Sequence, residues 1–70
     1  MSIMKMMYDE LRHYGNVIGD KEHKTTDGIF IRFITYEFEG MYYVVTMVDG
    51  SVFMVAEKED LKELIGNENN

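Results

Sequence analysis

The strongest pattern along the chain lies between residues 29 and 57, where three apolar segments are separated by two short turn signals. The segments 29–38, 41–48 and 51–57 are rich in aromatic and β-branched residues, which favour strands. The dipeptides Glu39-Gly40 and Asp49-Gly50 separate them, and such pairs favour two-residue hairpin turns because these turns need positive φ angles. The pattern therefore predicts an antiparallel meander of three strands.

The turns also predict which side chains share a face of the sheet. With regular two-residue hairpins, Val45 is expected to pair with Ile34 on one side and with Met54 on the other. The face that holds these residues is apolar apart from Arg32. The opposite face is expected to carry Ile29, Ile31, Phe33, Thr35, Glu37, Tyr42, Val44, Thr46, Val48, Ser51, Phe53, Val55 and Glu57. Both faces are thus largely apolar, although an antiparallel sheet commonly leaves one face polar.

A helical pattern precedes the sheet. Apolar residues recur at spacings of three and four from Ile3 to Tyr14, which predicts a helix over about residues 2–14 that ends at Gly15 and packs on one face of the sheet. The segment 16–28 that follows is mostly polar and charged, and it is predicted to be a loop, either a solvated connector or a functional element.

A second, shorter helical pattern follows the sheet. Leu61, Leu64 and Ile65 form an apolar edge, which predicts a helix over about residues 58–66, with a frayed tail at 67–70. The whole chain, residues 1–70, is then one α+β domain with the order α-β-β-β-α.

This order resembles the topology of the double-stranded-RNA-binding domain. That family contacts phosphates through a long C-terminal helix with a basic start, whereas the corresponding segment here, EKEDLKELIG, is short and net acidic. The resemblance therefore extends to topology alone and does not imply RNA binding.

The charge of the chain narrows the expected partners. Thirteen acidic and seven basic residues give a formal net charge of −6. Binding to a phosphate backbone depends on Lys and Arg, so direct nucleic-acid binding is not expected, and a protein with a basic surface is the expected partner. The sequence shows neither an apolar run long enough to span a membrane nor a signal peptide, so no membrane contact and a cytoplasmic location are expected.

Acidic residues gather at one end of the predicted sheet. In the regular register Glu37, Tyr42 and Glu57 are cross-strand neighbours. Together with the adjoining turn and the second helix, the predicted anionic patch comprises Glu37, Glu39, Tyr42, Glu57, Glu59, Asp60 and Glu63. Such a patch is either a solvated surface or an imitation of a phosphate backbone that docks on a basic groove.

No motif predicts catalysis, a cofactor or a metal site. Glu37 and Glu57 are expected two strands apart, roughly 9.6 Å at the backbone, and His13 and His23 lack the regular spacing of zinc ligands. There are no cysteines for a thiolate site. Arg32, the lone charge on the core face, is expected to reach Asp9, Glu10 or a backbone carbonyl. The chain is therefore predicted not to be an enzyme.

Two functions remain from these patterns. The first is a small acidic domain that binds and inhibits or modulates a basic, nucleic-acid-handling protein, in the manner of small proteins of phages and mobile elements. The alternative is a homodimeric structural or accessory domain that self-associates through the second apolar face. The residues predicted for that contact are Ile29, Ile31, Phe33, Val44, Val48, Phe53 and Val55.

Overall fold

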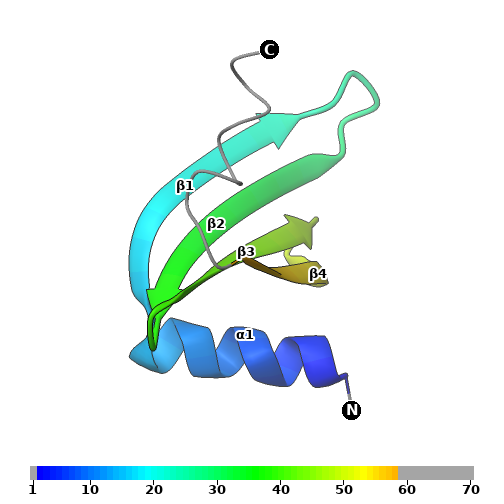
Figure 1. The fold of residues 1–70 in the computed structure, drawn as a ribbon. Coiled ribbons are helices and arrows are strands. Elements are labelled where there is room, and N and C mark those ends of the chain that lie inside the picture. Colours follow the sequence, from blue (N-terminus) through cyan, green and yellow to red (C-terminus); the bar gives the residue numbers. More distant parts are fainter. Residues whose placement is uncertain (1, 59–70) are drawn as a thin grey trace.

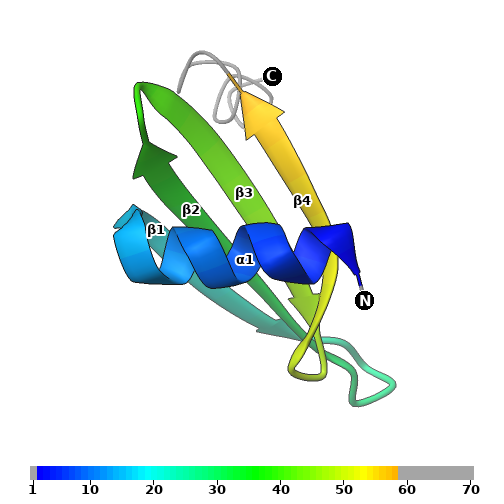
Figure 2. The same cartoon turned by 90° about the horizontal axis from the view of Figure 1, so that it is seen from below.

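The fold consists of one helix below a curved, four-stranded antiparallel sheet (Figure 1). The computed structural model describes residues 2–58. The elements are helix α1 (Ile3–Tyr14) and strands β1 (Asn16–Lys24), β2 (Phe30–Phe38), β3 (Met41–Val48) and β4 (Ser51–Lys58). The strands lie in the order β1-β2-β3-β4. Figure 2 shows α1 crossing one face of this sheet. The α+β class and the antiparallel sheet are as predicted.

The prediction of a three-stranded meander is wrong because segment 16–28 contains a strand. Residues Asn16–Lys24 pair with β2 from Glu37 to Phe30, with one irregularity between Val17 and Gly19, and only residues 25–29 form the connecting loop. Almost every side chain of β1 is exposed, so this strand is held at the edge of the sheet by its backbone hydrogen bonds with β2 and needs no apolar pattern.

Residues 2–58 contain no second helix. Lys58, the first residue of the helix predicted over 58–66, ends strand β4 and pairs with Tyr42. The remainder of that prediction, together with the tail at 67–70, lies outside the described residues. The order in the described chain is therefore α-β-β-β-β instead of α-β-β-β-α.

Helix α1 begins and ends close to the residues that its sequence predicts. The Ser2 side chain caps the first turn by accepting a hydrogen bond from the Lys5 amide at 3.4 Å. Gly15 ends the helix in an extended conformation, with its N–H bonded to the Leu11 carbonyl at 2.7 Å. A Cβ at Gly15 would lie 2.6 Å from that carbonyl oxygen and 3.2 Å from the Tyr36 ring. Glycine is therefore required here by close packing and not by a left-handed backbone.

The two hairpin turns form as predicted. Glu39 and Gly40 have φ angles of 51° and 78°, and Asp49 and Gly50 have φ angles of 49° and 84°. Both turns therefore have positive φ at their two central residues, which matches the right-handed twist of the flanking strands. The predicted register between β2 and β3 is confirmed, since Ile34 lies opposite Val45.

The predicted register between β3 and β4 holds only next to the turn. Met47 pairs with Val52, but Thr46 pairs with Met54, so Phe53 is an extra residue in β4. Such a β-bulge shifts every later residue of its strand by one position and so moves it to the other face. Val45 consequently pairs with Val55 instead of Met54.

A small core lies between α1 and the middle of the sheet. Its buried members are Leu11, Ile34, Tyr36, Val45 and Met47. Leu11 is the only buried residue of α1, and the other four come from β2 and β3. Because Ile34, Tyr36, Val45 and Met47 alternate along their strands, the residues between them belong to the opposite face. We call that opposite side of the sheet the open face.

Candidate interaction surfaces

The open face is apolar at its centre. Strand pairing assigns to it, among apolar and threonine residues, Ile31, Phe33, Thr35, Val44, Thr46, Val48, Met54 and Ala56. Phe53, the unpaired bulge residue, follows Val52 of the helix side, so alternation along the strand places it on the open face as well. Phe33, Phe53 and Met54 are 41%, 62% and 45% exposed. The register places Met54 opposite Thr46 and leaves Phe53 unpaired beside Met54, both on edge strand β4. Within residues 2–58, no helix covers this centre.

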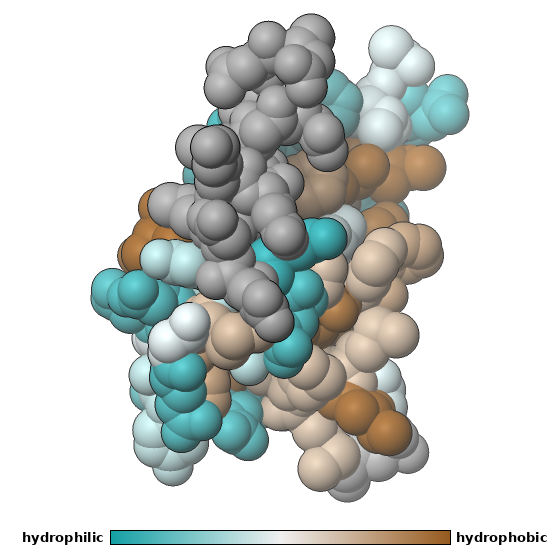
Figure 3. Space-filling model, viewed as in Figure 1, coloured by the Kyte–Doolittle hydropathy of each residue, from teal (hydrophilic) through white to brown (hydrophobic). Residues whose placement is uncertain are grey.

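Two of the residues predicted for the second apolar face lie elsewhere. The bulge moves Val55 to the helix side, where it packs against the core. Ile29 lies in the β1–β2 loop before β2 begins and is 39% exposed. Met54, which the regular register assigned to the core, belongs to the open face instead. In Figure 3, apolar side chains gather on the right-hand side of the view, from below the β1–β2 loop down to the N-terminal end of α1.

Charged side chains of the open face lie around this centre. Lys21 and His23 lie on edge strand β1, opposite Phe33 and Ile31. Glu37 and Lys58 lie at the end of the sheet near the β2–β3 turn. An apolar centre with a polar rim is the usual anatomy of a protein–protein interface.

The predicted anionic patch is divided between the two faces. Glu37 and Tyr42 pair with each other on the open face, as predicted. Glu57 pairs with Tyr43 on the helix side, because it follows the bulge. Glu39 lies in the β2–β3 turn. Glu59, Asp60 and Glu63 lie outside the described residues.

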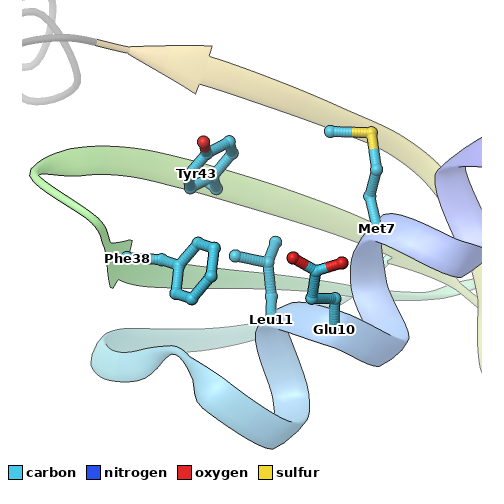
Figure 4. A pocket seen from close by; sticks show the side chains of 5 residues that line it. All are labelled: Met7, Glu10, Leu11, Phe38 and Tyr43. Carbon is cyan, nitrogen blue, oxygen red and sulfur yellow. The ribbon is translucent and has the colours of Figure 1, made fainter.

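A shallow pocket lies on the helix side of the sheet, beside Tyr43. It has a volume of about 90 Å³ and is lined by Met7, Glu10, Leu11, Phe38 and Tyr43. Figure 4 shows the carboxylate of Glu10 beside Leu11, with the rings of Phe38 and Tyr43 across from the helix. Sequence reasoning assigned Glu10 a different role, as a candidate partner of Arg32. Glu10 follows Met7 by three residues and directly precedes Leu11. This proximity to the apolar stripe of α1 is the sequence signal that could have placed Glu10 at the pocket.

Acidic side chains surround the Tyr43 phenol. Burial raises the pKa of Tyr43 above its ordinary value, and the charge of Glu57 and a side-chain hydrogen bond with Glu57 raise it further. The charges of Glu39 and Glu10 raise the pKa of Tyr43 in the same direction. Negative charge nearby disfavours the phenolate, so these carboxylates favour the protonated phenol.

Replacing Glu57 by glutamine tests this arrangement. The Glu57→Gln substitution removes a neighbouring charge, so the pKa of Tyr43 is expected to fall, while burial keeps it above the ordinary value of about 10. The measurement is an NMR titration of the tyrosine ring carbons. Glu37→Gln is the matched control, because Glu37 lies on the open face, and it is expected to leave the pKa of Tyr43 unchanged. An unchanged pKa in Glu57→Gln would contradict the bulge.

Arg32 binds a residue that sequence reasoning did not consider. Its Nε and Nη2 atoms donate hydrogen bonds to Oδ1 and Oδ2 of Asp20 at 2.9 and 2.6 Å. Asp20 lies on β1, which the sequence predicted to be a loop, so this partner could not be assigned to the sheet. The bidentate pair holds the pKa of the Asp20 carboxyl below its ordinary value. Of the partners expected for Arg32, Asp9 forms an ion pair with Arg12 instead, at 3.7 Å.

Metal-ligating clusters and membrane-spanning helices are both absent from the part of the chain that the structure describes. Residues 2–58 bring together no group of three His, Cys, Asp or Glu side chains able to hold a metal ion. Among the same residues, no helix is long and apolar enough to cross a membrane. Comparisons of the chain with models of protein families, with curated proteins and with solved structures found no match.

Proposed function

We propose that this protein is a small, non-enzymatic accessory domain that self-associates by packing its open face against the open face of a second copy. The observation that carries the proposal is the exposure of Phe33, Phe53 and Met54 on a sheet face that α1 leaves uncovered. Large apolar side chains that are contiguous and exposed mark interaction surfaces in soluble proteins.

The distribution of charge favours a second copy as the partner. The four strands hold the acidic residues Asp20, Glu22, Glu37 and Glu57, and strand pairing assigns only Glu37 to the open face. Lys21 and Lys58 belong to the same face. Two copies of a chain with a net charge of −6 repel each other, and contact through the open face keeps three of these four strand residues, Asp20, Glu22 and Glu57, away from the interface.

The size of the face predicts a weak dimer. Three strand spacings of about 4.8 Å and eight residues of about 3.3 Å give a projected area of roughly 400 Å² per copy. Stable interfaces bury about 800 Å² per partner, so a contact of this size belongs to the low end of the range. Dissociation at micromolar concentrations is therefore expected.

The proposal is tested by sedimentation velocity over a dilution series from about 1 μM to 1 mM. The mass is expected to rise from 8.2 kDa towards twice that value. Phe53→Asp introduces a charge on the open face at strand β4, where no core packing is lost because the ring is 62% exposed. This variant is expected to remain a folded monomer throughout, with dimerisation weakened by at least about tenfold.

Ile3→Asp is the matched control for Phe53→Asp. Ile3 is 75% exposed at the first position of α1, on the side of the sheet opposite to the open face, and an acidic residue is favourable at a helix N-terminus. The control has the same added charge and is expected to dimerise like the unmodified chain. A monomeric unmodified chain at 1 mM, or equal loss of association in both variants, would refute self-association through the open face.

A further inference from the structure

The pocket beside Tyr43 combines an apolar lining with one carboxylate. Met7, Leu11, Phe38 and Tyr43 supply a thioether, an aliphatic side chain and two rings, and Glu10 supplies the charge. Figure 4 shows these groups facing the same space between α1 and the ends of β2 and β3. The pocket lies on the helix side of the sheet and is therefore separate from the open face.

The surroundings of the pocket are negatively charged. Glu57 is the cross-strand partner of Tyr43, and Glu39 lies in the turn that joins β2 to β3. The carboxylates of Glu57, Glu39 and Glu10 all raise the pKa of the Tyr43 phenol. A ligand of complementary charge for this pocket is a cation.

The apolar lining selects among cations. A metal ion takes several oxygen ligands and keeps polar surroundings, whereas only Glu10 lines this pocket with a carboxylate. A guanidinium group suits it better, because it is weakly hydrated, stacks on aromatic rings and pairs with a carboxylate through two parallel hydrogen bonds. The methylene stem of an arginine side chain packs on apolar surface in the same manner.

We propose that the pocket formed by Met7, Glu10, Leu11, Phe38 and Tyr43 binds an arginine side chain presented by a partner protein. The arginine stem lies over Met7 and Leu11, and its guanidinium stacks on the Phe38 or Tyr43 ring and pairs with Glu10. Glu57 and Glu39 add attraction at the rim. The partner is thus a protein with a basic surface, and it contacts the side of the sheet opposite to the self-association face.

The test uses three capped tripeptides, with arginine, lysine or citrulline between two glycines, in NMR titrations of the full chain. Citrulline has the shape of arginine without its charge. The arginine peptide is expected to bind with a Kd in the range of about 1–10 mM, with shifts concentrated at Leu11, Phe38 and Tyr43. The lysine and citrulline peptides are expected to bind at least about threefold and tenfold more weakly.

Two variants with the same loss of charge locate the binding site. Glu10→Gln is expected to weaken binding of the arginine peptide by at least about fivefold, whereas Glu22→Gln on the exposed edge strand is expected to change it by less than about twofold. The proposal is overturned if the citrulline peptide binds as well as the arginine peptide, if both variants bind alike, or if no saturable shifts occur. Repeating the titration in Phe53→Asp separates this result from self-association, which uses the other face.

Discussion

Replacing Leu11 by alanine is expected to lower the free energy of unfolding by about 2–5 kcal/mol, measured by urea denaturation followed by circular dichroism. Leu11 is 3% exposed and is the only buried residue of α1, so it is the main attachment of the helix to the sheet. A helix of 12 residues is marginal in isolation, and it depends on this packing. A small domain has roughly 0.05–0.15 kcal/mol of stability per residue, so this loss is a large part of the whole.

Met6→Ala is the matched control for Leu11→Ala. Met6 belongs to the same helix and is 54% exposed, so its truncation removes a side chain of similar size without leaving a cavity. The expected change is within about 0.5 kcal/mol. A loss of less than about 1 kcal/mol in Leu11→Ala would mean that α1 is not docked through this residue.

Deleting Phe53 is expected to leave the fold intact, whereas deleting Thr46 is expected to unfold it. Phe53 is the extra residue of the bulge, so its removal restores a regular ladder in which Met54 still pairs with Thr46 and Val55 with Val45. Thr46 lies in β3, which pairs with strands on both sides. Its deletion moves half of that strand to the wrong face, including Val45 or Met47 of the core.

The measurement is the dispersion of amide signals in NMR spectra, together with thermal unfolding, at concentrations low enough to keep both variants monomeric. The chain without Phe53 is expected to give a dispersed spectrum and cooperative unfolding. The chain without Thr46 is expected to give neither. If both deletions had equal effects, the irregularity between β3 and β4 would lie at another residue.

The sequence predicted those parts of the fold that a turn or an apolar stripe defines locally. Glu39-Gly40 defined the β2–β3 register, and the spacing from Ile3 to Tyr14 defined α1. Strand β1 was not predicted, because the side chains of this edge strand are nearly all exposed and so show no alternation of apolar and polar residues. Its signals in the sequence were the apolar pair Val17-Ile18, which could form a short extended segment, and Asp27-Gly28 ahead of β2, a turn dipeptide that is also compatible with a hairpin loop between two strands.

The bulge could not be predicted because β4 is apolar at five successive positions, from Val52 to Ala56. Either register buries apolar side chains, so the pattern does not distinguish them. The prediction of the candidate site was affected too, because the register decides on which face of the sheet Glu57 lies. The acidic character of this end of the sheet was predictable from composition, but the grouping of Glu57 with Tyr43 and Glu10 needed the three-dimensional structure.

The two outer strands share an irregularity that limits the addition of further strands to the sheet. β1 is irregular between Val17 and Gly19, and β4 is irregular at Phe53, so both edges of the sheet carry a bulge. Bulged and charged edges resist the addition of further strands, which is the route to fibrils. A contact between two identical faces, by contrast, closes on itself after one pairing. A concentrated solution is therefore expected to contain discrete pairs and to stay clear, because neither edge serves as a template for growth.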